Sequence, residues 1–276
     1  MKFARDVYYV FWRDMKRFWI HKVRIFMSLF QPILWFILMG TTMNGMMTLF
    51  VENMGKSVNN TSVNSILVKT FFDNAPDYLS YVTSGIIAMT AIFAGFFGGT
   101  SVLSDRKIGF LTKMLSAPIS RAAIPIGKIL AIGVQIGIQV VVIILLAMLL
   151  GVKYTTGFGG VVILVLIAML FGMGLAGISL SLGAHIKSME TLISITAALT
   201  MPIMFASSAM FPTSSMPVWL KTIAICNPVT YVVMPMRTLI YKGWVFNDIF
   251  KGILFIIMFT IVTTIIAIFQ YRQNVD

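Results

Sequence analysis

Six long apolar runs alternate with short polar segments along this chain, and they restrict its possible folds more than any other feature. They cover roughly 25–49, 81–103, 124–150, 158–184, 191–211 and 251–270. A helix needs about 20 apolar residues to span a bilayer. Only 11% of the 276 residues are charged, against about 25% in a soluble domain. Because no gap between the runs could hold a soluble domain, we predict an all-α membrane protein with six transmembrane helices in a single domain, residues 1–276.

The basic residues predict how these helices are oriented. If the chain begins in the cytoplasm, 14 of its 21 Lys and Arg residues face the cytoplasm, in segments 1–24, 104–128, 185–190 and 271–276. Lys and Arg are enriched in cytoplasmic loops, so we predict that both ends are cytoplasmic and that the protein crosses the plasma membrane. This bias also accounts for the net charge of +12. We expect no nucleic-acid partner, since the basic residues do not gather on a soluble face among stacking aromatic residues.

Residues 1–24 have the pattern of an amphipathic helix. The charged residues recur at steps of three, four, seven and eleven: Lys2, Arg5, Asp6, Arg13, Lys16, Arg17 and Arg24. Trp12, Trp19 and several Phe residues occupy the remaining positions. A basic face beside Trp and Phe is typical of a helix that lies among lipid headgroups. The alternative is a helix that packs on the rest of its own chain.

Two segments outside the spans are expected on the outer side. Residues 212–240 contain four prolines, Pro212, Pro217, Pro228 and Pro235, yet remain largely apolar. The prolines exclude one continuous helix, so we predict a re-entrant hairpin before the last span, or alternatively a lid on the membrane surface. Segment 50–80 holds overlapping glycosylation sequons at Asn59 and Asn60. Such short motifs occur by chance, and they leave glycosylation open.

The chain lacks the motifs of an enzyme or of an ion-coupled carrier. Around Gly127 and Lys128, Ala122 replaces the first glycine of a phosphate-binding loop and Ile129 replaces its Ser or Thr. The spans carry almost no ionisable residue away from their ends, where an ion-coupled carrier would need one. Cys226 is the single cysteine, so neither an intrachain disulfide nor a thiol metal cluster can form. We therefore expect no catalytic site, metal or cofactor in this chain, and an energy source outside it.

Segment 104–128 is a polar stretch to which a separate, energy-supplying protein could attach. Its apolar residues Ile108, Leu111, Met114 and Leu115 recur at helical spacing, and Pro118 ends the pattern. We predict a short helix over 105–115 that begins at Asp105 and Arg106, with an apolar ridge that fits a groove on a partner protein. A helix lying on the membrane surface would show the same spacing.

Two motifs resemble the ABC-2 type permease family. The run from Asp105 to Arg121 is similar to its cytosolic signature, which has an acid–Arg pair, a Gly, a Leu pair, a Pro and Ser-Arg. The run from Phe211 to Arg237 resembles its C-terminal stretch, with Phe-Pro, Trp-Leu and Asn-Pro-Val-Thr-Tyr in order. Thr112 replaces a common acidic residue of the first motif, and Met234 lies where an acid is often found.

The resemblance implies the permease subunit of an ATP-driven exporter. A second permease chain would complete a homodimer, and two ATP-binding subunits would bind ATP and Mg. Residues 1–24 would form the connecting helix, and 104–118 the coupling helix, with contacts from Asp105, Arg106, Gly109, Leu111, Met114, Leu115, Pro118 and Arg121. Residues 212–240 would form an outer gate containing Phe211, Pro212, Pro217, Asn227, Pro228, Tyr231 and Arg237.

The substrate is less constrained than the family. Soft and aromatic side chains in the spans are candidates to line the path: Phe93, Phe97, Met204 and Phe205. The absence of charge inside the spans favours a hydrophobic drug or a lipid-like substrate. The alternatives are a polysaccharide or glycolipid exporter, a channel that works without a motor, and a membrane scaffold or sensor that transports nothing.

Overall fold

The computed structural model describes residues 2–57, 75–116, 118–210, 212–213 and 216–273, and within them it is helical without a β-strand. Phe211 and the sequons at Asn59 and Asn60 lie outside the described residues. The helices are α1 (Lys2–Ile20), α2 (Lys22–Ser57), α4 (Tyr78–Phe97), α5 (Thr100–Lys107), α6 (Phe110–Ser116), α7 (Ala123–Leu149), α8 (Gly157–His185), α9 (Met189–Phe205), α10 (Val218–Cys226), α11 (Pro228–Arg237), the π-helical η2 (Thr238–Lys242) and α12 (Phe246–Gln273).

The prediction of an all-α membrane protein is confirmed, with one adjustment to the spans. Five segments are long and apolar enough to cross a bilayer: Ile25–Met43, Tyr78–Lys107, Ala123–Leu149, Gly157–His185 and Phe246–Tyr271. The fifth predicted run forms only the 17-residue helix α9. At a rise of 1.5 Å per residue, α9 is about 26 Å long, slightly less than the hydrocarbon thickness of about 30 Å.

The proline-rich segment before the last span forms two helices rather than one. α10 and the continuous pair α11–η2 meet at an angle of 82°, and the break falls at Asn227 and Pro228. If α10 and α11–η2 together form one broken span, the chain has a sixth membrane crossing. If they do not, they form a re-entrant hairpin, as predicted. Pro228 occupies the first turn of α11, where its missing N–H leaves no hydrogen bond unmade.

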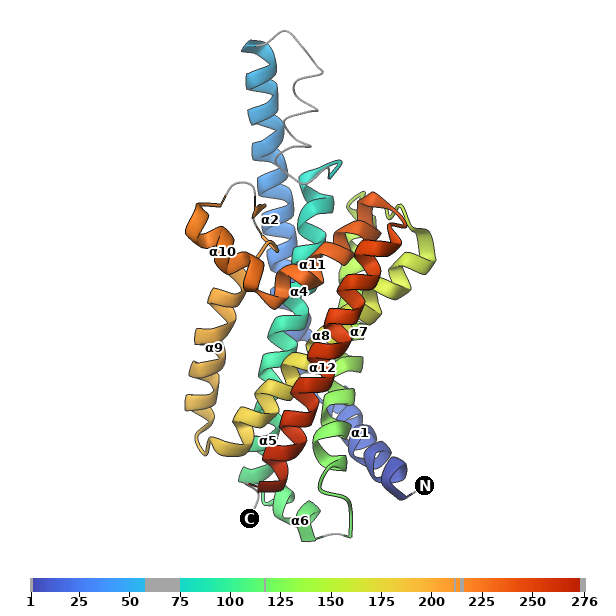
Figure 1. The fold of residues 1–276 in the computed structure, drawn as a ribbon, viewed down its shortest axis with the longest axis vertical. Coiled ribbons are helices and arrows are strands. Elements are labelled where there is room, and N and C mark those ends of the chain that lie inside the picture. Colours follow the sequence, from blue (N-terminus) through green and yellow to red (C-terminus); the bar gives the residue numbers. More distant parts are fainter. Residues whose placement is uncertain (1, 58–74, 117, 211, 214–215, 274–276) are drawn as a thin grey trace.

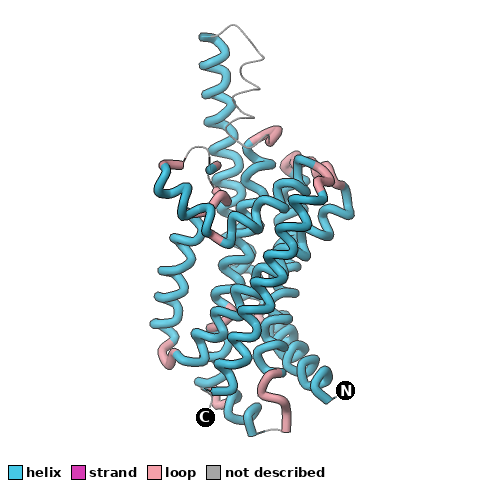
Figure 2. Tube along the Cα trace, viewed as in Figure 1, coloured by secondary structure: helices cyan, strands magenta, loops and turns pink. Residues whose placement is uncertain are grey.

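Both ends of the chain lie at the same end of the helical bundle (Figure 1). α6 lies at this end too, and α1 runs beside it, whereas α10 and α11 lie in the opposite half of the bundle (Figure 1). Loops are concentrated toward the two ends, and the helices run between them (Figure 2). This arrangement places residues 104–118 on the side of the N-terminus, as the charge distribution predicts.

α8 is the central helix, in contact with α4, α7 and α12. Small residues let the α12 backbone approach it closely. A Cβ atom added to Gly177 would lie 2.9 Å from the Thr263 carbonyl oxygen, and one added to Gly174 would lie 2.7 Å from the Phe259 ring. The Thr260 hydroxyl then donates a hydrogen bond of 2.8 Å to the Leu170 carbonyl. The hydrophobic effect does not drive helices together within a bilayer, so close packing and hydrogen bonds of this kind hold α8 and α12 together.

The position of α1 agrees with both interpretations of its sequence, a helix in the headgroup layer and a helix packed on its own chain. Val10, Met15 and Phe18 are buried, and the helix packs along α7. Tyr8, Trp12 and Trp19 remain more than half exposed on the other side. The helix therefore packs on its own chain with one face and leaves an aromatic face free, as a helix in the headgroup layer requires.

Candidate functional site

The predicted coupling segment is broken into two short helices. α5 ends at Lys107 and α6 begins at Phe110. Between them Gly109 has φ of +68°, a left-handed conformation that glycine adopts without steric cost. The prediction of one helix over 105–115 is therefore wrong. Asp105 lies in the last turn of α5, not at the start of a coupling helix.

The apolar face of this segment points into the protein, which corrects a second prediction. Leu111 is 3% exposed and Met114 is 6% exposed, both within the main hydrophobic core. Ile108, which the spacing placed on the same ridge, is instead 66% exposed, because the turn at Gly109 separates it from α6. The side chain of Leu115 lies outside the described residues. The exposed residues of the segment are Lys107, Ile108, Gly109, Thr112, Lys113 and Ser116, together with Pro118 and Arg121 of the following loop.

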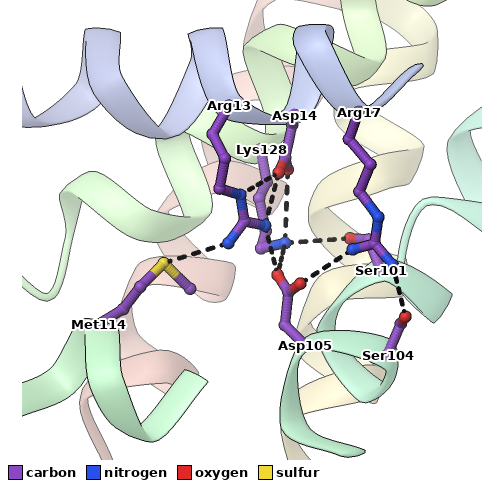
Figure 3. A network of polar contacts seen from close by, with 8 residues as sticks. All are labelled: Arg13, Asp14, Arg17, Ser101, Ser104, Asp105, Met114 and Lys128. Atoms are coloured by element: carbon purple, nitrogen blue, oxygen red, sulfur yellow. Dashed lines mark hydrogen bonds and ion pairs between the residues drawn. The ribbon is translucent and has the colours of Figure 1, made fainter. Parts of the chain in front are cut away.

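Asp105 is the centre of a buried ion-pair network between α1, α5 and α7 (Figure 3). Its carboxylate accepts hydrogen bonds from Lys128 Nζ at 2.5 Å, Arg13 Nη2 at 2.6 Å and Arg17 Nη1 at 3.0 Å. The side chain of Asp105 is 1% exposed and that of Lys128 is 0% exposed. A charge buried this deeply is tolerated only when it is paired. Lys128 therefore has to remain beside Asp105.

Asp14 adds a second carboxylate to the network. It accepts a hydrogen bond of 2.6 Å from Arg13 Nη2 and lies 3.4 Å from Lys128 Nζ. Burial by itself lowers the pKa of the Arg13 guanidinium, but the carboxylates of Asp14 and Asp105 outweigh it, so the pKa lies above its ordinary value. Three cations and two carboxylates leave the network with a net charge of about +1.

Arg13 joins the network to α6. Its guanidinium lies 4.3 Å from the centre of the Phe110 ring and donates to Met114 Sδ at 3.6 Å. Arg106, also predicted to touch a partner, instead donates to the carbonyl oxygens of Ala184 and Ile186 and so caps the end of α8. Movement of α6 would therefore reach α1 through Arg13, and α5 is fastened to α8 through Arg106.

The sequence reasoning missed Arg13, Asp14, Arg17 and Lys128 as members of one cluster. Asp105 is separated by 92 residues from Arg13 along the chain, so no local motif joins them. The available signals were a lone acid at the end of an apolar run, and Arg13 and Arg17 one helical turn apart on α1. Lys128, which the sequence placed at the end of the cytoplasmic segment 104–128, is buried near the start of α7.

In the outer segment, Asn227 joins the end of α9 to the start of α11. Its side-chain amide donates to the carbonyl oxygens of Ile203 at 2.7 Å and Ala206 at 2.9 Å. Its side-chain oxygen accepts from the Val229 N–H at 3.0 Å and so caps α11. Pro217 precedes α10 in an extended conformation, and Pro212 is half-buried.

Arg237 holds the same segment against α4. It is 3% exposed, and its guanidinium lies 3.8 Å from the centre of the Tyr81 ring. It donates to the Ser84 hydroxyl at 3.3 Å and to the Ser208 carbonyl oxygen. Tyr231 stacks on Phe255 of α12, with ring centres 4.8 Å apart. Of the predicted gate residues that are described, Asn227, Tyr231 and Arg237 thus tie the hairpin to α9, α12 and α4.

We expect the substitution Asn227→Ala to destabilise the outer hairpin by about 2–3 kcal/mol. It removes an N-cap, worth about 1 kcal/mol, and leaves two carbonyl groups without their donor. Limited proteolysis of the protein in detergent should show faster cleavage around 206–230. Asn247→Ala, at an exposed position, is the matched control and should leave the rate unchanged. Equal cleavage rates for the two variants would contradict the role given to Asn227.

A cavity of about 550 Å³ opens beside the ion-pair network. Residues of α1, α2, α4, α5 and α7 line it, together with Met189 at the start of α9. Phe93 and Phe97, two of the predicted path residues, lie on its wall and stack on each other. The other two do not join them: Met204 is buried elsewhere, and Phe205 at the end of α9 is 42% exposed. The four residues predicted to line the path therefore do not line one common cavity.

Comparison with known proteins agrees with this architecture. Residues 5–241 match the family model of the ABC-2 type transporter. The chain is 30% identical to the transport permease ycf38 of Cyanophora paradoxa over 66% of both chains. It is 28% identical to ycf38 of Porphyra purpurea, over 83% of this chain and 72% of the relative. It is 24% identical to the daunorubicin resistance ABC transporter permease protein DrrB1 of Streptomyces coeruleorubidus, over 65% and 63%. The chain therefore belongs to the ABC-2 type transporter family.

Proposed function

We propose that this chain is the permease subunit of an ATP-driven exporter that moves a hydrophobic drug or a lipid-like substrate out of the cytoplasm. In this proposal two copies of the chain pair in the plasma membrane. Two separate ATP-binding subunits attach at the end that carries α6, and they bind the ATP and Mg. The proposal makes this chain a transport subunit without an ATPase site of its own.

The observation that carries this proposal is the position and surface of α6. It projects at the end of the bundle where both ends of the chain lie (Figure 1). It exposes Thr112, Lys113 and Ser116, with Ile108 beside them. Through Phe110 and Met114 it contacts Arg13, and through Arg13 it reaches the network around Asp105. A motor that displaces α6 would therefore move α1, α5 and α7 together.

The choice of a drug-like substrate has two supports. DrrB1, by its name, belongs to daunorubicin resistance. The cavity beside Phe93 and Phe97 has the volume typical of sites for drug-sized ligands. A polysaccharide exporter or a motor-independent channel remains the alternative, and neither draws support from a particular feature of the described residues.

Reconstitution separates these functions. We expect the purified chain in proteoliposomes to hydrolyse no ATP and to pass no substrate. Co-reconstitution with its ATP-binding subunit should give ATP hydrolysis and efflux of a hydrophobic dye that stops when Mg is chelated. Flux through the chain alone without nucleotide would instead establish a channel. Failure of the chain to form a complex with any ATP-binding subunit encoded beside it would contradict the exporter assignment.

A further inference from the structure

We propose that the cavity beside the ion-pair network binds an elongated amphiphile with an anionic group at one end and a hydroxyl or carbonyl group at the other. The cavity lies within one chain, between α1, α2, α4, α5 and α7. The proposal that this cavity binds a ligand rests only on the positions and chemistry of its lining residues. Only the further step, that this ligand is the transported cargo, rests on the proposed exporter function.

Several apolar side chains line the cavity, among polar residues that include Gln31, Thr90 and Gln135. Phe93 and Phe97 stack with their rings 6.4 Å apart on the α4 side. Ile132 of α7 and Met27 and Pro32 of α2 also line the cavity. Flat and flexible apolar side chains of this kind hold a hydrocarbon or ring system without demanding a particular shape.

The end of the cavity at α1 is cationic. Arg17 lies on this wall with Ser104 and Asp14, and its side chain is 32% exposed. It donates to Asp105 and to Ser104, which uses two of the five N–H groups of a guanidinium. Asp14 would oppose an anion here, but it is already paired with Arg13 and Lys128. Because the whole network carries about one net positive charge, this end favours an anionic headgroup.

The other end of the cavity carries a buried amide. Gln139 of α7 lines the cavity and is 4% exposed. No hydrogen bond to its side chain is present among the residues that the structure describes. The Gln139 amide atoms are not among the enclosed polar atoms that lack a partner, so they open onto the cavity and are available to a ligand that can hydrogen-bond to them. Gln135, one turn nearer to Lys128 on the same helix, also lines the cavity.

The spacing of the two ends argues against an ordinary membrane lipid. Along α7 the cavity lining runs from Ala131 to Gln139, a rise of about 12 Å, which is less than the thickness of one hydrocarbon leaflet, about 15 Å. The headgroup of a phospholipid could reach Arg17, but its acyl chain would then leave Gln139 without a hydrogen bond. A ligand with polar groups at both ends satisfies Arg17 and Gln139 together.

Laurate and ω-hydroxylaurate are matched probes, since they differ only in the terminal hydroxyl. Binding of the labelled acids is measured with the full chain in phosphatidylcholine nanodiscs, and partition into empty nanodiscs is subtracted. We expect a Kd about tenfold lower for ω-hydroxylaurate than for laurate, the gain from one added hydrogen bond. Gln139→Leu should abolish this difference and retain laurate binding, which also reports that the variant is folded. Arg17→Gln should weaken both acids, and Gln273→Leu, at an exposed position of α12, should change neither.

Two results would overturn the proposal: equal affinities of the wild-type chain for the two acids, or an unchanged difference in Gln139→Leu. Displacement of ω-hydroxylaurate by phosphatidylglycerol at an equal molar ratio would also overturn it, because the cavity would then be a site for bilayer lipid. In the complex with the ATP-binding subunit, ATP should release the bound acid to the opposite side. Binding without such release would count against the exporter function and leave the cavity assignment standing.

Discussion

Asp105→Asn should be the most destabilising single substitution among the charged residues of the described chain. It would leave Lys128 fully buried, with only Asp14 at 3.4 Å to oppose its charge. Breaking a buried ion pair by removing one partner costs about 3–5 kcal/mol. The Arg13 and Arg17 guanidinium groups would also lose their shared acceptor. We expect a large fall in the unfolding temperature in detergent, followed by tryptophan fluorescence, and a low yield of folded protein.

Two further variants distinguish a lost ion pair from a general effect of the substitution. The double variant Asp105→Asn with Lys128→Met removes the buried cation as well, and it should recover most of the lost stability, because a well-packed apolar group can replace a buried pair. Asp248→Asn is the matched control at an exposed site in the first turn of α12, and it should change stability by less than about 1 kcal/mol. A double variant as unstable as Asp105→Asn alone would contradict the pairing of Asp105 with Lys128.

The transmembrane helices could be predicted from the sequence because a bilayer imposes a length and an apolar composition on each of them. The same criteria failed at α9, where the apolar run continues past Phe205 but the helix does not. The chain turns there so that Asn227 can bind the carbonyl groups of Ile203 and Ala206. That interaction joins residues more than 20 positions apart, and hydropathy carries no information about it.

The candidate site was harder to predict than the spans for a related reason. Helical spacing correctly grouped Leu111 with Met114, but a period cannot tell whether an apolar face meets a partner or the protein's own core. Asp105 was recognised as part of a motif, yet its partners come from α1 and α7. Gly109 was the local signal for the break between α5 and α6, and it was visible in the sequence, since glycine commonly ends a helix.

If the proposed ATP-binding subunit attaches at α6, Ile108→Asp should weaken its binding without unfolding the chain. Ile108 is 66% exposed beside the turn at Gly109, so a charged side chain there remains in water and the fold tolerates it. An apolar residue at the centre of an interface contributes about 2 kcal/mol or more, which corresponds to a roughly 30-fold loss of affinity. We expect a normal unfolding temperature, together with a loss of binding to the ATP-binding subunit in a pull-down titration and a loss of ATP-dependent transport.

Leu111→Asp should behave differently from Ile108→Asp, although the apolar spacing in the sequence places Leu111 and Ile108 on the same helix face. Leu111 is 3% exposed in the core, so an aspartate there would bury an unpaired charge and unfold the region. Leu149→Asp, at an 84% exposed position at the opposite end of α7, controls for an added charge and should keep motor binding. If Ile108→Asp binds the ATP-binding subunit as the wild type does, the motor attaches elsewhere than the exposed side of residues 108–116. If Leu111→Asp instead folds normally and loses only motor binding, then Leu111 faces the partner and the inward orientation of α6 is wrong.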